Sequence, residues 1–120
     1  ISFLSNLKEL NLSYNSINGN IPNTLPDKIE KLMLSNNNLS GALPPHLNSY
    51  NELHTLSVGN NKLSDALPSD MFPPSLRELD VGGNDFIGTI PDALFDCQRL
   101  IDVDLSVNRF GGTISSRWSS

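Results

Sequence analysis

The sequence predicts an α/β solenoid, with a parallel β-sheet on its concave side and short 3₁₀ or irregular segments on its convex side. Three observations support this fold class. One pattern of eleven residues recurs five times, and the five copies follow one another at nearly constant spacing. The eight prolines all fall in the second half of a repeat, where they remove backbone donors that a long helix would need.

The recurring pattern is LxxLxLxxNxL, with Ile, Val or Phe also allowed at the apolar positions. Its first copy runs from Leu7 to Ile17, and its last runs from Leu100 to Phe110. The Asn of the pattern stands at positions 15, 37, 61, 84 and 108, so the intervals are 22, 24, 23 and 24 residues. Such a fixed period is the sequence signature of a stacked repeat architecture.

The LxLx part of each copy predicts one short strand per repeat. Side chains alternate along a strand, so Leu10 and Leu12 face one side while Asn11 and Ser13 face the other. Each repeat cannot bury its Leu face alone, but stacked repeats bury a continuous core. Strands of successive repeats then pair in parallel about 4.8 Å apart.

The second half of the repeat resembles GxIPxxL, as in the segments 19–25, 41–47 and 88–94. Asp65 replaces the Gly of the third copy, and Ser115 replaces the Pro of the fifth. With LxxLxLxxNxL, this pattern resembles the plant-type leucine-rich repeats over the whole chain. The resemblance implies a second short strand near the GxIP segment.

We expect one leucine-rich-repeat segment over residues 1–120, cut from a longer protein, since the chain opens with Ile1 and no signal peptide is visible. Residues 1–6 look like the tail of a preceding repeat. The expected repeats are 7–28, 29–52, 53–75, 76–99 and a partial one at 100–120.

Composition excludes several classes of function. The net charge of −5 argues against nucleic-acid binding, which needs clustered Lys and Arg. No apolar run approaches the roughly 20 residues of a membrane span. His46 and His54 belong to no nucleophile or metal motif, so we expect no catalytic site, cofactor or metal in this segment. Cys97 cannot form an internal disulfide, and the resemblance implies that it packs inside.

The repeated Asn is expected to be structural. The resemblance implies that these side chains stack as a ladder and bond to the backbone of adjacent turns, a role that an amide can fill as donor and acceptor. Asn61, in mid-stack, should matter more for stability than Asn108 near the end. The ladder residues are Asn15, Asn37, Asn61, Asn84 and Asn108.

Two N-glycosylation acceptor sequences occur, Asn11-Leu12-Ser13 and Asn38-Leu39-Ser40. They favour a secreted protein mildly, because Asn-Leu-Ser also arises from the repeat itself. We expect Asn38 to be more accessible than Asn11, which lies on the face of the predicted sheet.

The outward side chains of the predicted strands form columns, which become wholly acidic in the last two complete patterns, at Glu78, Asp80, Asp102 and Asp104. The residues leave three interpretations open: a solvated acidic face, a patch for a basic partner, and a calcium site. Calcium is disfavoured because a flat sheet supplies its six or more oxygen ligands poorly. Tyr14 and Met33 are the other candidate contact residues on this face.

A rigid curved sheet with small and polar side chains offers a broad docking surface. The resemblance implies recognition of a protein, peptide or glycan ligand by a receptor-like or secreted protein, at the cell surface or outside the cell. Two alternatives stay open: the ectodomain of a receptor kinase whose catalytic domain lies outside this segment, and a structural surface-coat protein.

Overall fold

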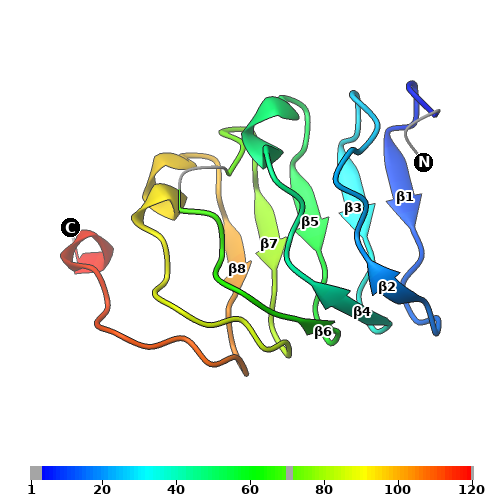
Figure 1. The fold of residues 1–120 in the computed structure, drawn as a ribbon. Helices are drawn as coiled ribbons and strands as arrows, with labels where there is room; N and C mark the ends of the chain where they lie inside the picture. Colours follow the sequence, from blue (N-terminus) through cyan, green and yellow to red (C-terminus); the bar gives the residue numbers. More distant parts are fainter. Residues whose placement is uncertain (1–3, 70–71, 120) are drawn as a thin grey trace.

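A computed structural model describes residues 4–69 and 72–119 and shows a stack of coils with two parallel sheets (Figure 1). Residues 1–3 of the expected N-terminal tail, residues 70–71 of the third repeat and residue 120 lie outside the described residues. The predicted fold class is confirmed.

The larger sheet contains one strand from each copy of the LxLx pattern, in the order β1-β3-β5-β7-β8. All of its neighbouring strands pair in parallel. Each strand is short because only three residues of the repeat alternate before the chain turns. The strands are β1 (Glu9–Asn11), β3 (Lys31–Met33), β5 (Thr55–Ser57), β7 (Glu78–Asp80) and β8 (Asp102–Asp104).

A second, three-stranded sheet lies apart from the first and has the order β2-β4-β6 (Figure 1). Its strands are β2 (Asn18–Asn20), β4 (Asn38–Gly41) and β6 (Lys62–Leu63). They end before the Pro of each GxIP segment, because Pro cannot donate to a sheet ladder. The second strand implied by the resemblance is therefore present in the first three repeats.

The convex side holds three 3₁₀ segments within the described residues, in place of long helices. They are η1 (Leu47–Ser49), η2 (Asp92–Asp96) and η3 (Ser116–Ser119). Short segments are what the prolines and the 22–24-residue spacing predict.

The core is a continuous apolar column between the two sheets. Leu32, Leu56 and Leu79 hold equivalent positions and expose only 1%, 0% and 2% of their surface. Cys97 is buried in the same core, with its Sγ 3.6 Å from the carbonyl oxygen of Pro73. Burial raises the pKa of this thiol, and the charge of Asp96 raises it further, so Cys97 behaves as a small apolar side chain.

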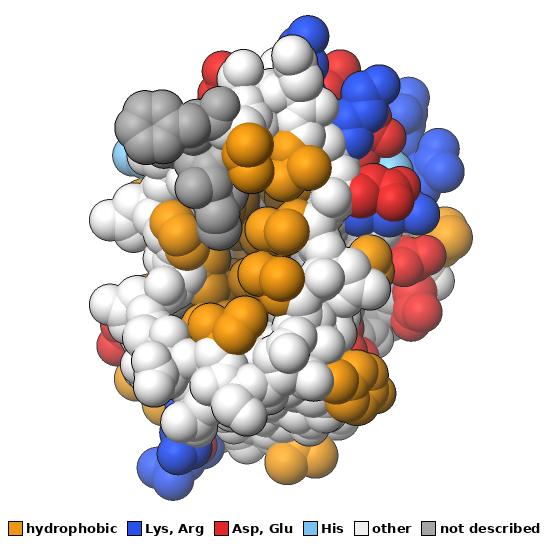
Figure 2. Space-filling model, turned by 90° about the vertical axis from the view of Figure 1, so that its right-hand side faces the viewer, with side chains coloured by type: hydrophobic (Ala, Val, Ile, Leu, Met, Phe, Trp, Pro, Cys, Tyr) orange, Lys and Arg blue, Asp and Glu red, His pale blue; other side chains and the backbone are white. Residues whose placement is uncertain are grey.

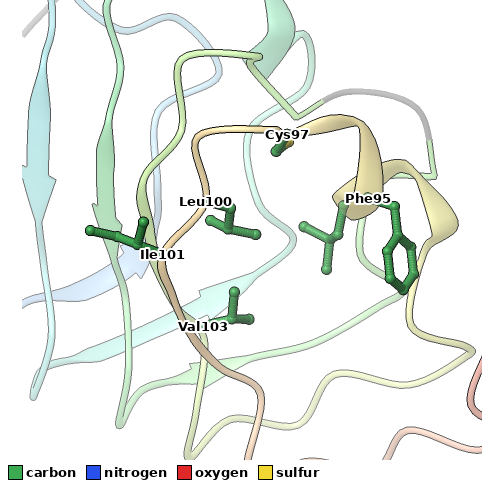
Figure 3. A pocket seen from close by; sticks show the side chains of 6 residues that line it. Phe95, Cys97, Leu100, Ile101 and Val103 are labelled. Atoms are coloured by element: carbon green, nitrogen blue, oxygen red, sulfur yellow. The ribbon is translucent and has the colours of Figure 1, made fainter. Parts of the chain in front are cut away.

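Both ends of the described stack show the edge of this core. Leu10 and Leu12 at the N-terminal end are only partly buried, and together with Ile17 and Leu25 they line an apolar hollow that Figure 2 views face on. At the other end a hollow of about 310 Å³ is lined by Leu94, Phe95, Cys97, Leu100, Ile101 and Val103 (Figure 3).

Within residues 4–69 and 72–119, no helix has the length and apolar character needed to cross a membrane.

Candidate recognition site on the concave sheet

The register of the concave sheet aligns its outward side chains in the two columns that the sequence predicts. The first column is Glu9, Lys31, Thr55, Glu78 and Asp102, and the second is Asn11, Met33, Ser57, Asp80 and Asp104. Equivalent residues of successive repeats therefore stand directly beside one another, which makes the face a continuous surface across five strands.

The four acidic residues of the last two strands come together around one hollow of about 260 Å³. Polar side chains of β5 complete its lining. The lining residues are Thr55, Leu56, Ser57, Glu78, Leu79, Asp80, Asp102 and Asp104.

Two of the carboxylates are held by turns at the ends of their own strands. Asp80 accepts a hydrogen bond from the backbone N–H of Gly82 at 3.0 Å. Asp104 accepts one from the backbone N–H of Ser106 at 2.9 Å and another from the Ser106 hydroxyl. These Asx turns fix the direction of both side chains, so the carboxylates are ordered before any partner arrives.

Each of these carboxylates lies close to a glycine of the preceding repeat, where a larger residue would collide with it. A Cβ at Gly59 would lie 2.9 Å from the Asp80 carboxylate oxygens, and a Cβ at Gly82 would lie 2.8 Å from Oδ1 of Asp104. The sequence pattern alone predicted neither this function of the two glycines nor the role of Ser106. The Asp-x-Gly and Asp-x-Ser spacing is the signal that could have indicated the turns.

The pKa values of the two turn-bound carboxylates are shifted in opposite directions. Desolvation raises the pKa of Asp80, and the charges of Asp104 and Asp102 raise it further. The hydrogen bond from the Gly82 N–H acts in the opposite direction and lowers this pKa. Hydrogen bonds from the hydroxyl and the N–H of Ser106 lower the pKa of Asp104. The hollow therefore combines one carboxylate that is readily ionised with one that binds a proton more easily.

Glu78, Asp80, Asp102 and Asp104 form an acidic cluster, and no neighbouring cation neutralises it. Elsewhere on this side of the molecule, Glu9 pairs with Lys31 at 3.7 Å, and Glu30 pairs with Lys8 at 3.8 Å. Among the described residues, no ion pair involves Glu78, Asp80, Asp102 or Asp104. The end of the sheet with β7 and β8 thus presents a net negative charge.

The acidic cluster does not have the geometry of a metal site. No group of three or more His, Cys, Asp or Glu residues in the described part of the chain is arranged to hold an ion.

The two apolar candidates lie at the other end of the sheet. Met33 is half-buried in the second column on β3, and Tyr14 follows β1 with 81% of its surface exposed. Strand β5 separates them from the acidic cluster. A ligand that contacts both groups must therefore cross the strands.

The Asn side chains that follow the concave strands join successive repeats. Nδ2 of Asn61 donates to the carbonyl oxygens of Val58 in its own turn and Leu34 in the preceding turn, at 2.9 and 3.0 Å. Its Oδ1 accepts the backbone N–H of Leu39 at 2.9 Å. Asn37, Asn84 and Asn108 likewise donate to a carbonyl oxygen and accept a backbone N–H of the preceding turn.

The first member of the set differs. Among the described residues, Nδ2 of Asn15 donates only within its own turn, to the carbonyl oxygens of Leu12 and Ser13. Asn108, although near the end of the stack, donates to Val81 of the preceding turn at 2.9 Å. Hydrogen bonding therefore gives no support to the expected weakness of Asn108 and makes Asn15 the least connected residue of the five.

The two glycosylation acceptor sequences lie on different sheets. Asn11 is on β1, in the concave sheet, and Asn38 begins β4 of the second sheet. Both side chains are exposed, so exposure alone does not separate them.

Known proteins with similar sequences are plant receptor-like proteins. Receptor-like protein 43 of Arabidopsis thaliana is 35% identical over 97% of this chain, and receptor-like protein EIX1 of Solanum lycopersicum is 36% identical over 95% of it. The chain spans only 17% and 11% of the lengths of these two relatives.

Solved structures with the same fold include plant receptors in complexes. The peptide hormone receptor RGFR1, in complex with RGF2, has a TM-score of 0.89 and 33% identity over 99% of this chain and 20% of its own. The Arabidopsis receptor kinase HAESA, in complex with the peptide hormone IDA and the co-receptor SERK1, has a TM-score of 0.76 and 32% identity over 91% of this chain and 19% of its own.

The family model described as Leucine Rich Repeat matches residues 6–27, 28–50 and 75–97, which together form more than half of the chain. Strands, core and repeated Asn side chains agree with that match. The chain therefore belongs to the leucine-rich-repeat family, in the plant-type form found in receptor-like proteins.

Proposed function

We propose that this chain is a recognition segment of a receptor-like protein and binds a protein or peptide ligand on its concave sheet. The acidic cluster, defined as Glu78, Asp80, Asp102 and Asp104, binds a basic side chain of that ligand. Met33 and Tyr14 contact the part of the ligand that lies over β1 and β3.

The observation that carries this proposal is a group of uncompensated carboxylates around a hollow on the concave face. Two of them are directed by hydrogen bonds from Gly82 and Ser106. A guanidinium or ammonium group that enters the hollow gains charge-assisted hydrogen bonds, and the fork of Arg matches a carboxylate in two places. Such a ligand also relieves the repulsion between like charges on neighbouring strands.

The similar proteins support the class of ligand. RGFR1 was solved with RGF2, and HAESA with a peptide hormone and a co-receptor, both at more than 30% identity to this chain. From these complexes we infer a peptide or protein ligand, and we infer a location at the cell surface from the receptor-like relatives.

We assign a binding role to this segment, because the similar proteins are receptor-like proteins and receptors that were solved in complexes with peptide hormones. We infer that the longer protein that contains this segment is a receptor-like protein, since relatives with that name are 35% and 36% identical to this chain. A receptor kinase is the alternative, at the 32% identity of HAESA.

The test is neutralisation of the acidic cluster by Glu78→Gln, Asp80→Asn, Asp102→Asn and Asp104→Asn together. Random peptides displayed on phage are selected on the unmodified chain, and the enriched peptides are synthesised and measured. We expect peptides rich in Arg and Lys, with association that slows as salt rises. The neutralised variant should lose at least tenfold in affinity, and bound peptide should shift the backbone NMR signals of β5, β7 and β8.

The control removes four exposed carboxylates that lie outside the concave strands, through Asp27→Asn, Glu52→Gln, Asp65→Asn and Asp92→Asn. Asp96 is left intact because it pairs with Arg117 at 3.1 Å. If both quadruple variants change peptide affinity alike, or if the enriched peptides contain no excess of basic residues, the cluster is a solvated face. That result would favour the surface-coat alternative.

A further inference from the structure

The sequence Asn38-Leu39-Ser40 is presented by the fold as an acceptor for a large polar group. Strand β4 alternates, so Leu39 packs into the core with 4% exposure while Asn38 and Ser40 both face solvent. The amide that would be modified and the hydroxyl that completes the acceptor sequence therefore project from the same side of one strand.

The Asn38 side chain has no structural task among the described residues. Its amide makes no hydrogen bond to any of them, in contrast to the neighbouring Asn37, whose amide joins two turns. The backbone of Asn38 is held in place, since its N–H donates to the carbonyl oxygen of Ile17 at 2.8 Å. A group attached to Nδ2 would break no side-chain hydrogen bond to the described residues and would project from an ordered strand.

The position of Asn38 also leaves the concave sheet free. Asn38 lies in the second sheet, which is separate from the strands that carry the acidic cluster (Figure 1). Asn11 lies in the second concave column beside Met33, where an attached oligosaccharide would cover the proposed ligand surface.

From this geometry we propose that Asn38 carries an N-linked glycan, which shields the face formed by β2 and β4 and leaves ligand binding to the concave sheet. The proposal rests on the cell-surface location inferred under the proposed function, because proteins reach the cell surface through the secretory pathway.

The chemistry is a glycosyl transfer from a lipid-linked diphosphate oligosaccharide. A bond forms between Nδ2 of Asn38 and the anomeric carbon of the first sugar. The bond from that carbon to the diphosphate oxygen breaks, the lipid diphosphate leaves with the bonding electrons, and one amide proton passes to a base of the transferase. No oxidant or reductant is involved.

The chain is expressed in plant cells with a secretory leader. The leader directs the chain into the secretory pathway whatever the natural location of the protein is. Chain from the medium and chain retained in the secretory compartments are both purified. Peptide mass spectrometry after enzymatic deglycosylation in ¹⁸O water then measures occupancy at Asn38 and Asn11. We expect Asn38 to be occupied in most molecules.

Matched variants identify the acceptor. Asn38→Gln and Ser40→Ala should each abolish the mass shift at Asn38, and Ser40→Thr should retain it. Asn11→Gln and Ser13→Ala should leave the Asn38 glycan unchanged. An unmodified Asn38 in both pools would overturn the proposal.

Occupancy at Asn11, measured in the same samples, decides a different question. A glycan at Asn11 would contradict the use of β1 and β3 for ligand binding, because it would cover that part of the concave face. The peptide that contains Asn38 therefore tests the glycan proposal, and the peptide that contains Asn11 tests the ligand-binding proposal.

Discussion

At the scale of single residues, Asn61 shows how one side chain can take over several backbone bonds. The chain turns away after each concave strand, so its carbonyl groups lose the partners that a longer strand would provide. The Asn61 amide supplies a donor to Leu34 and Val58 and an acceptor to Leu39, while only 8% of Asn61 is exposed. Buried backbone groups without a partner are costly, so this residue links turn geometry to stability.

Replacement of Asn61 by Leu should lower the free energy of unfolding by about 1–3 kcal/mol or more, because several buried backbone groups lose their partner. The matched change Asn15→Leu should cost less, since the exposed Asn15 bonds only within its own turn. Urea melts of both variants measure the difference. Equal losses at the two positions would contradict the role of the cross-repeat bonds.

A second residue-scale prediction concerns the opposite pKa shifts of Asp80 and Asp104. The pKa of Asp80 is raised by burial, so its ionised form opposes folding, and this effect grows as pH rises through the folded-state pKa. Asp80→Asn should therefore raise stability at neutral pH by roughly a few tenths of a kcal/mol. The gain should vanish below the ordinary Asp pKa of about 3.9.

Asp104→Asn should have the reverse sign. The pKa of Asp104 is lowered by Ser106, so its charged form stabilises the fold above the ordinary pKa, and that contribution is lost as pH falls. Urea melts at pH 7 and at acidic pH compare each variant with the parent chain. A loss of stability for Asp80→Asn at pH 7 would show that the Gly82 hydrogen bond outweighs burial.

At the scale of secondary-structure elements, each concave strand ends in the same left-handed turn. The residue before the repeated Asn has a positive φ in every repeat: Tyr14 (59°), Asn36 (59°), Asn60 (54°), Gly83 (66°) and Val107 (52°). Asn and Gly adopt this conformation readily, whereas a β-branched side chain does so at a cost. The fold imposes this turn even where the local sequence disfavours it.

Val107→Asn should therefore stabilise the chain by roughly 0.5–1 kcal/mol, because it removes backbone strain and sacrifices no core contact. The Val107 side chain is 79% exposed, so no buried surface is lost. The reciprocal change, Asn60→Val, should destabilise by a similar amount. Thermal melts of both variants check the sign, and a destabilised Val107→Asn would mean that this side chain makes stabilising contacts of its own.

At the scale of the whole molecule, the stack is elongated, with extents of 41 × 27 × 20 Å. Each coil contacts only its neighbours, so burial depends on place in the stack. Leu32 and Leu56 are covered on both sides, whereas Leu10 at the N-terminal end is only partly buried. Charge is also unevenly placed, since residues 61–120 carry five Lys or Arg and nine Asp or Glu, or −4 of the net −5. A basic ligand would therefore be attracted to the end with β7 and β8.

The sequence alone was sufficient to predict the repeat, the strand positions and the columns of the concave face. These features depend on two periods that are written in the chain, the alternation along a strand and the spacing of the Asn residues. Once strands stack in register, Glu78 must stand beside Asp102 and Asp80 beside Asp104. The residues of the acidic columns could therefore be predicted from the sequence periods without the tertiary structure.

Only the tertiary structure decided what those residues do to one another. The close approach of Asp104 to Gly82, the desolvation that raises the pKa of Asp80 and the pairing of Lys31 with Glu9 all depend on distances between repeats. Desolvation and the distances between charged groups are set by neighbours more than 20 residues away along the chain, and a local pattern carries no measure of either.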